Sequence, residues 1–425
     1  KESSVSNWFS NLKIRFSYGE MGDDNVPGYG DFDYLGGYTF NNGSAIISKD
    51  PAGALEGSFI KGSAARQTPV TTVSWITAKM INLGIDAGFF NNKLTVEFDM
   101  FQRRRSGLLA DSELILPAEV SVRIPKKNLN TDMTTGLDAA VRWNDETRGG
   151  FRYYAGFNMS LARLKNVFVA NERTNNSWDR YLWSSNNRWA NASGRGSAWL
   201  YQVVGQFKTQ EQIDNHPVDI DGQGNRTLLP GDYYYKDWNN DGKINDYDLR
   251  PLGYGSDLPY LNFGINIGFD CAADFAGASM QTYVFTTDAR YPFWDQNRNA
   301  PKYMLNDRWH HEDIFDPTSP WVPGTYPAIR SNKKDYETGS FKDQSSFLLN
   351  NTNYLRLKNL EIGYSLPGRW LSKVKIEKLR IYVNGSNLFS IDNLHDKGLD
   401  PEQGVSSGLN YPIHRVYTIG ANLVF

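Results

Sequence analysis

One segment of the chain carries oxygen-bearing side chains at the spacing of a calcium-binding loop. Its predicted ligands, at positions 1, 3, 5, 7 and 12, are Asp237, Asn239, Asp241, the carbonyl of Lys243, and Asp248. Gly242 occupies position 6, where such a loop turns sharply. Oxygen ligands in this number and order suit calcium, a hard cation that takes six to eight of them. We therefore expect a structural calcium ion that fastens this loop.

The same segment departs from a complete EF-hand loop in two ways. Asp248 stands where Glu is usual, so its shorter side chain would reach the ion through one oxygen or through water. No helical pattern flanks the segment, because Tyr233-Tyr234-Tyr235 precede it and Arg250-Pro251 follow. An ordinary surface turn rich in Asn, Asp and Gly is the alternative interpretation.

Side chains that could perform catalysis are scattered through the chain. The five His show no metal-ligand spacing, and the one adjacent pair, His310 and His311, is interpreted as loop structure. There is no G-x-S-x-G motif and no phosphate-binding loop. We predict no enzymatic activity and no catalytic or cofactor-binding residues, although the sequence does not exclude a carboxylate pair for glycoside hydrolysis.

The composition excludes several classes of protein. The 425 residues include 12 Trp, 24 Tyr and 23 Phe, too many aromatics for a disordered chain. No run approaches 18 consecutive apolar residues, which excludes membrane-spanning helices. A single Cys, Cys271, excludes a disulfide framework, and a net charge of -2 gives no reason to expect nucleic acid as a partner. The first residues do not resemble a signal peptide, so an exported protein would be a mature chain or a fragment.

Alternation of apolar and polar residues recurs from end to end and predicts long strands. Leu12, Ile14 and Phe16, for example, alternate with Lys13 and Arg15. Ten strands are predicted, at residues 11–19, 79–90, 93–104, 134–144, 150–163, 259–269, 273–286, 351–366, 378–389 and 414–425. This pattern gives each strand one apolar face and one polar face, as in either a soluble sandwich or a membrane barrel.

The lengths of the connections favour the barrel. Short turns near residues 91–92, 145–149, 270–272 and 367–377 alternate strictly with long segments at 19–78, 105–133, 164–258, 287–350 and 390–413. An outer-membrane barrel has this arrangement, with tight turns at one rim and long loops at the other. Unstructured loops of this length argue against a compact soluble domain. The predicted fold class is thus all-β, a transmembrane antiparallel β-barrel, with a soluble or surface-tethered glycan-binding or glycan-degrading protein as the alternative.

The last strand has the pattern of a lipid-facing strand. Tyr417, Ile419, Ala421, Leu423 and Phe425 recur at every second position and are apolar or aromatic. If the strand ends in the periplasm, the long loops lie outside the cell. The expected location is therefore the bacterial outer membrane, in contact with lipid, with extracellular loops and a periplasmic C-terminus.

Several stretches resemble the SusC/RagA family of TonB-dependent outer-membrane transporters of Bacteroidetes. The resemblance runs through the whole chain in the family's order. It rests on residues 11–19, 82–101, Gly231-Asp232 leading into the calcium-like loop, 354–367, 379–389, 398–402 and Tyr411-Pro412 leading to Phe425.

The resemblance implies that residues 1–425 are the C-terminal portion of a 22-stranded barrel. The remaining N-terminal barrel strands, the plug domain, the TonB box and the signal peptide are then expected outside this chain. The implied function is TonB-dependent uptake of oligosaccharides or oligopeptides, without chemistry on the substrate. The implied partners are a SusD-like lipoprotein lid and the TonB complex, and the substrate-binding groups are expected among loop aromatics such as Trp178, Trp183, Trp189, Trp294, Trp309 and Trp321.

Overall fold

The structure is a computed structural model. It describes residues 9–23, 37–47, 58–65, 74–110, 127–170, 188–189, 199–254, 259–269, 271–285, 291–293, 300–330, 336–337, 344–371, 376–403, 411 and 413–424. Trp178, Trp183, Trp294 and Phe425 lie outside these residues.

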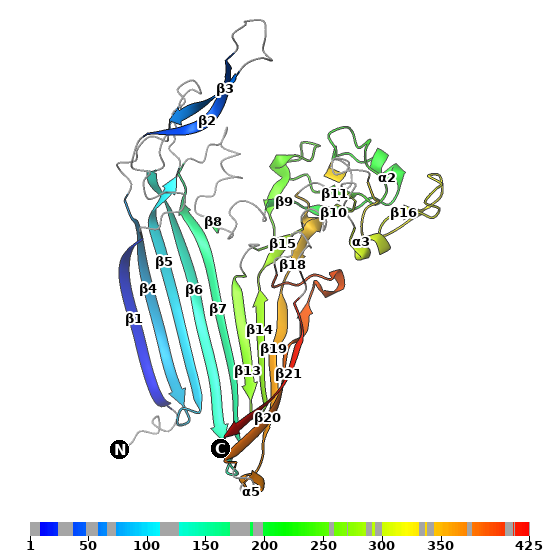
Figure 1. Cartoon of the computed structure of the whole chain (residues 1–425). Coiled ribbons are helices and arrows are strands. Elements are labelled where there is room, and N and C mark those ends of the chain that lie inside the picture. The colour runs from blue at the N-terminus through cyan, green and yellow to red at the C-terminus, as the bar shows by residue number, and fades with distance from the viewer. Residues whose placement is uncertain are drawn as a thin grey trace.

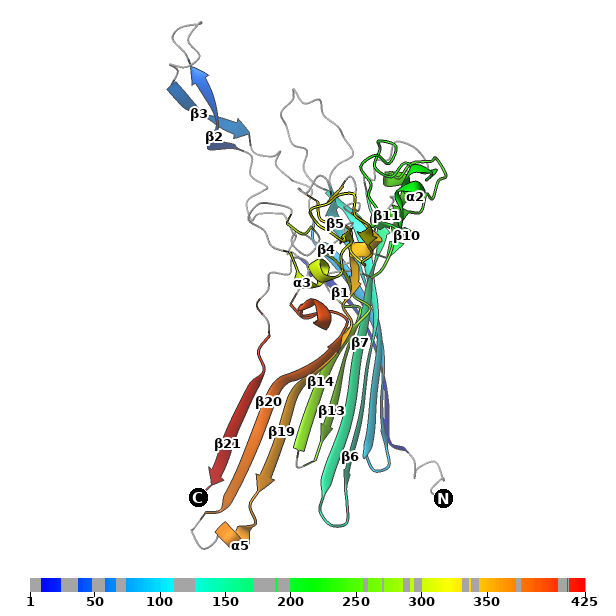
Figure 2. The same cartoon turned by 90° about the vertical axis from the view of Figure 1, so that its right-hand side faces the viewer.

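Ten long strands form one antiparallel sheet, in the order β1-β4-β5-β6-β7-β13-β14-β19-β20-β21. Their bounds are β1 (Phe9–Asp23), β4 (Ile76–Phe89), β5 (Leu94–Ala110), β6 (Lys127–Glu146), β7 (Arg152–Phe168), β13 (Leu261–Gly268), β14 (Cys271–Ser279), β19 (Tyr354–Ser365), β20 (Lys378–Asp392) and β21 (Val416–Val424). The short β8 (Arg188–Trp189) pairs with β7. The sheet curves strongly from β1 at one edge to β21 at the other (Figures 1 and 2).

The register gathers most of the large apolar side chains of the sheet on one face, here called the outer face. Ile14 lies opposite Ile85, which lies opposite Phe98, and Phe16 opposite Leu83, which lies opposite Met100. These side chains are exposed rather than buried: Phe16 is 71% exposed and Ile419 is 79% exposed. Among the described residues no second layer covers them. Because a soluble sandwich buries this face, its exposure is that of a sheet with lipid as its solvent.

The predicted fold is confirmed, with ten strands at the ten predicted places. Two predicted boundaries are seven residues off: β6 begins at Lys127 rather than at 134, and β14 ends at Ser279 rather than continuing to 286. Met280 adopts a left-handed φ of 59°, which turns the chain out of the sheet. After Gln281, the short strand β15 (Thr282–Val284) pairs instead with β18 (Leu349–Asn351).

The rim with the short turns carries a band of aromatic rings. Phe9 and Phe89 lie 4.9 Å apart between ring centroids, and Phe151 and Phe269 lie 5.9 Å apart. Aromatic rings gather at the level of the lipid headgroups in outer-membrane barrels. The short helix α5 (Gly368–Leu371) lies at the same rim (Figure 1).

At the other rim, parts of two long connections fold together into a compact unit, here called the loop lobe (within residues 199–254, 300–330 and 344–348). It contains β9 (Trp199–Tyr201), β10 (Val203–Gln206), α2 (Gln210–Asp214), β11 (Tyr233–Tyr235), η3 (Asp246–Asp248), β12 (Leu249–Pro251), α3 (Lys302–Asn306), β16 (His310–His311), β17 (Trp321–Val322) and η6 (Ser346–Leu348). Its core buries residues such as Phe207, Ile213, Ile220 and Leu348. The prediction of unstructured loops is therefore wrong for this part.

Two further elements lie on the loop side of the sheet. The hairpin of β2 (Tyr38–Ile47) and β3 (Ser58–Ala65) projects beyond β1 and β4, and η8 (His395–Lys397) follows β20 (Figure 1). No helix among the described residues is long and apolar enough to cross a membrane.

Candidate functional site

Polar side chains cover the face of the sheet opposite the apolar one, here called the inner face. Lys13, Arg15, Asp86, Glu97 and Asp99 point to this side by strand alternation. Arg15 donates to both oxygens of Asp86, at 2.9 and 2.7 Å, and to Asp99 at 2.8 Å. Charges are thus paired across three strands, on the side that faces the lumen of a barrel.

Gly84 makes room for this ion-pair group. It lies directly opposite both Arg15 and Asp99 in the register. A Cβ atom at this position would stand 2.4 Å from Asp99 Oδ1 and 2.8 Å from Arg15 Cζ. A larger residue would displace the ion pairs that cross the strand here.

The inner face is hollowed into a groove of about 510 Å³. Its polar lining includes side chains of four neighbouring strands: Glu97, Asp99, Asp138, Asn158, Ser160 and Asn262. Carboxylates, amides and a hydroxyl can bind water or the polar groups of a passing solute. The groove is therefore a candidate wall for a hydrated pathway.

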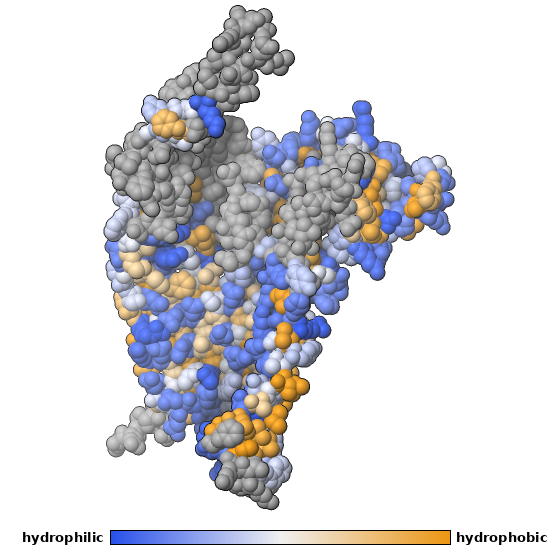
Figure 3. Space-filling model, viewed as in Figure 1, coloured by the Kyte–Doolittle hydropathy of each residue, from blue (hydrophilic) through white to orange (hydrophobic). Residues whose placement is uncertain are grey.

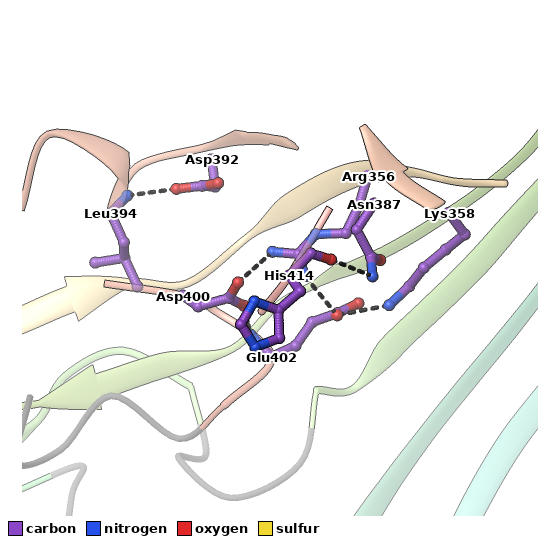
Figure 4. A network of polar contacts seen from close by, with 8 residues as sticks. All are labelled: Arg356, Lys358, Asn387, Asp392, Leu394, Asp400, Glu402 and His414. Carbon is purple, nitrogen blue, oxygen red and sulfur yellow. Dashed lines mark hydrogen bonds and ion pairs between the residues drawn. The ribbon is translucent and has the colours of Figure 1, made fainter. Parts of the chain in front are cut away.

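A buried ion-pair group fastens the segment after β20 to β19 (Figure 4). Arg356, on the inner face of β19, donates to Asp400 at 2.7 Å and to Glu402 at 2.8 Å, and Lys358 donates to Glu402 at 2.6 Å. The Arg356 side chain is only 5% exposed. The fully buried Leu394 packs in the same segment, and its N–H is held by Asp392. These contacts hold the loop across the inner side of the barrel wall.

A second depression, of about 760 Å³, lies in the loop lobe. Its lining residues come from three separate parts of the chain: Gln206, Lys208, Tyr233, Asp307, Trp309, Trp321, Pro323, Gly324, Thr325 and Phe347. The Tyr233 and Phe347 rings lie 4.3 Å apart, and Trp309 and Trp321 lie 6.5 Å apart. An apolar wall with a few polar groups is the usual form of a small-ligand site.

The polar groups of this depression are held by the fold. The Gln206 amide donates to the carbonyls of Gly231 and Thr325, at 2.7 and 3.2 Å, and the Tyr233 hydroxyl donates to the Thr325 carbonyl. Burial, followed by neighbouring charges, raises the pKa of Tyr233, so the hydroxyl keeps its proton. Asp307 and Lys208 lie exposed at the rim and offer one charge of each sign.

The predicted calcium ligands lie in one tight loop of the lobe. Asp237 accepts main-chain N–H bonds from Asn240 and Gly242, at 2.6 and 2.8 Å. Gly242 has a φ of 78°, the left-handed turn expected at position 6. The carboxylate of Asp241 accepts from the amides of Asn239 and Asn245, which lowers its pKa.

Asp248 is fully buried at the end of this loop and accepts N–H bonds from Trp238 and Asn245, at 2.7 and 2.9 Å. Burial raises its pKa, and the nearby charges of Asp237 and Asp241 raise it further. Three carboxylates are thus close enough to repel one another, which a cation would relieve. Within the described residues, no three acidic, His or Cys side chains form a ready metal cage. Calcium binding therefore stays a prediction.

A second aspartate turn beside this loop is absent from the sequence interpretation. Asp219 forms a bridge with Lys243, and the Ile244 N–H donates to the Asp219 carbonyl at 2.9 Å. Asp221 accepts from Thr227, Gln223 and Asn225; although burial acts in the opposite direction, these bonds lower its pKa to about 2. The D-x-D-G pattern at 219–222 was the available signal.

Comparison with known proteins agrees with this geometry. No protein-family model matches the chain. The TonB-dependent receptor P3 of Formosa agariphila is 23% identical over 449 residues, which cover 99% of this chain and 40% of that receptor. The TonB-dependent receptor SusC of Bacteroides thetaiotaomicron is 24% identical, over 99% of this chain and 38% of its own length. The chain is similar to SusC-like TonB-dependent receptors.

The solved structures agree on the fold. The structure of the RagAB peptide importer in the open-open state has a TM-score of 0.65 and 20% identity, over 99% of this chain and 41% of that one. The chain spans about two fifths of the length of these SusC-like relatives. The predicted resemblance is confirmed, as is a sheet that matches the C-terminal part of a TonB-dependent barrel.

The structure unites only some of the predicted binding aromatics. Trp309 and Trp321 both line the depression of the loop lobe. Sequence reasoning missed Gln206, Tyr233 and Phe347, because Phe347 lies more than 100 residues along the chain from the other two. His310 and His311, predicted as loop, form β16, where the His311 ring lies 3.9 Å from the Trp321 ring.

Proposed function

We propose that this chain is one side of an outer-membrane barrel that imports oligosaccharides or oligopeptides in a TonB-dependent manner. The observation that carries the proposal is the distribution of side chains on the sheet, whose apolar face is exposed and whose charged face lines a groove. Water on the inner face and lipid on the outer face is the environment that this distribution fits.

The proposal includes an orientation. The aromatic band supports placing the short-turn rim at the lipid headgroups of one membrane surface. The loop lobe then lies beyond the headgroups of the opposite surface. We place the lobe outside the cell and the end of β21 in the periplasm. The lobe and the groove beneath it would then meet substrate in that order.

The proposed partners are those of the similar receptors. The name TonB-dependent receptor supports energy supply by TonB through a part of the transporter outside this chain. The edge strands β1 and β21 would pair with the remaining barrel strands, since lipid does not tolerate unpaired backbone groups. A SusD-like lipoprotein would cover the lobe side.

The substrate remains one of two classes of polymer. The peptide importer among the structural neighbours supports oligopeptides. The relative named SusC supports a SusC-like transporter without selecting either substrate class. Aromatic walls beside an amide and two opposite charges suit the faces of sugar rings and also peptide side chains.

The test is uptake by cells that carry the full-length transporter. Membrane fractionation is expected to leave the protein in the outer-membrane pellet until detergent is added. Cells with the transporter should accumulate labelled oligosaccharides or oligopeptides, and loss of TonB should abolish that uptake. Release into buffer without detergent, or uptake that persists without TonB, would overturn the proposal.

We also propose that the loop from Asp237 to Asp248 holds a structural calcium ion. The ligand spacing, the left-handed turn at Gly242 and the like charges of Asp237 and Asp241 near Asp248 support it. Mass spectrometry of native protein is expected to find one calcium that EDTA removes, with a lower unfolding temperature of the lobe afterwards. Asp241→Asn should weaken binding, whereas Asp246→Asn, outside the predicted ligand set, should not. Protein purified without chelator that contains no calcium would refute this site.

A further inference from the structure

The hairpin formed by β16 and β17 ends in a short segment that projects from the loop lobe, here called the hairpin tip (Glu312–Pro320). Ile314 is 64% exposed and Phe315 is 89% exposed at this tip. Because the lobe buries rings such as Phe207, Tyr233 and Tyr235, this is an unusual place for two exposed apolar side chains. Figure 3 shows apolar surface at the far end of the lobe, where this projection lies.

The hairpin tip is rigidly built. The Phe315 N–H donates to the Asp313 carboxylate at 2.9 Å, and Thr318 donates to Asp316 through both its N–H and its hydroxyl. The Ser319 hydroxyl bonds the carbonyls of Asp313 and Asp316, at 3.1 and 2.8 Å. The two apolar side chains are therefore held out before any contact forms, which lowers the entropic cost of binding.

The base of the hairpin is fixed as firmly as its tip. His311 Nδ1 lies 2.7 Å from the Ser319 carbonyl oxygen, and its ring lies against Trp321. The Trp309 N–H donates to the Tyr326 carbonyl at 2.8 Å. The same hairpin thus carries Trp309 and Trp321 of the depression at its base and Phe315 at its end.

The charges around the tip select the kind of surface that it fits. Glu312, Asp313 and Asp316 flank the two apolar residues, and no Lys or Arg occurs from Trp309 to Ile329. Hydrogen bonds from Thr318 lower the pKa of Asp316, so this carboxylate stays charged. An anionic lipid surface would repel such a tip, whereas an apolar pocket bordered by Lys and Arg would complement it.

From this geometry we infer that the hairpin tip is an anchor for a protein partner, with Phe315 and Ile314 inserted into an apolar pocket edged by basic side chains. This inference rests on the proposed function, and it assigns the partner as the SusD-like lipoprotein. An exposed aromatic residue on a rigid support, ringed by polar groups, is the typical form of an interface hot spot. Because the hairpin also carries two Trp of the depression, docking at the tip would hold the lobe site in place.

The test measures binding of the full-length transporter in detergent to the purified lipoprotein. The double variant Ile314→Asp/Phe315→Asp should weaken binding at least tenfold, chiefly through faster dissociation. Val204→Asp, which changes another exposed apolar residue of the lobe, should change binding less than twofold. Glu312→Lys should slow association severalfold at low salt, and high salt should remove the difference.

The outcomes separate this inference from the proposed function. Unchanged lipoprotein binding by the double variant, with an unchanged unfolding temperature of the lobe, would overturn the anchor. The anchor would also be overturned, in favour of a membrane contact, if the double variant still bound the lipoprotein and lost only its adsorption to protein-free anionic vesicles. If the wild type binds the lipoprotein through the tip but cells import no oligosaccharide or peptide, the proposed function fails and the anchor stands.

Discussion

The sheet and the loop lobe place their apolar residues in opposite ways. On the sheet, Phe16, Leu83 and Ile419 point outward and stay exposed. In the lobe, Phe207 and Ile213 point inward and are almost fully buried. Both arrangements occur in one chain, and they fit two different solvents, lipid around the sheet and water around the lobe.

The contrast also changes what stabilises each region. Burial of apolar area away from water stabilises the lobe, as in any soluble domain. Apolar side chains on the outer face gain little from leaving lipid, so main-chain hydrogen bonds and ion pairs such as Arg15–Asp86 must hold the sheet together. The following changes test that division, starting with the largest expected effect.

Removing a buried ring should damage the lobe far more than removing an exposed ring damages the sheet. Phe207 is 2% exposed and packs on His216 and Tyr234, with ring centroids 5.0 and 5.1 Å away. Phe207→Ala should cost about 3–5 kcal/mol of lobe stability. Phe16→Ala, on the outer face, should cost less than about 1 kcal/mol. Urea titrations in detergent, followed by Trp fluorescence, measure both, and equal losses would break the comparison.

The ion-pair group at Arg356 should behave as a buried site although it lies on the sheet. Arg356→Met leaves Asp400 and Glu402 without their main cation and should cost about 3–5 kcal/mol. Lys358→Met removes a more exposed partner and should cost about 1 kcal/mol or less. Faster proteolysis within residues 393–403 would report the loss. Resistance equal to the wild type would mean that other contacts hold this loop.

A charge placed on either face of the sheet should distinguish lipid from water. Leu83→Arg, near the middle of β4 on the outer face, should cost about 2–4 kcal/mol in lipid. Asn82→Arg, one residue away on the inner face, should cost much less. Folding yield into lipid vesicles, read from heat-modified gel mobility, gives both values. A similar loss for the two variants would contradict the assignment of the faces.

The smallest expected effect is a pH dependence confined to the lobe. Burial lowers the pKa of His216, and its Nε2 has no hydrogen-bond partner among the described residues. The unfolded lobe therefore takes up a proton first as pH falls below about 6.5, the ordinary value for His. Lobe stability should decrease from pH 7.5 to 5.5, and His216→Phe should flatten this slope. The sheet transition should stay the same in both proteins.

Local patterns in the sequence were sufficient for the sheet but not for the lobe. Alternation such as Leu94, Val96 and Phe98 depends only on neighbours in the chain, so it revealed all ten strands. The depression instead depends on Gln206, Tyr233 and Phe347 meeting across long intervals, which no local period encodes. The end of β14 was also hidden, because nothing in the residue type of Met280 requires its left-handed φ.

The closure of the lobe has a consequence for the order of folding. The Tyr201 N–H donates to the Gln344 carbonyl, and the Val203 N–H donates to the Ser346 hydroxyl. Strands β13 and β14 lie between these partners in the chain, and both belong to the sheet. Loop closure over such an interval is slow. The lobe can close only after the β13–β14 hairpin has crossed the membrane and brought both loops to the same side. A closed lobe therefore indicates that this part of the sheet has already assembled.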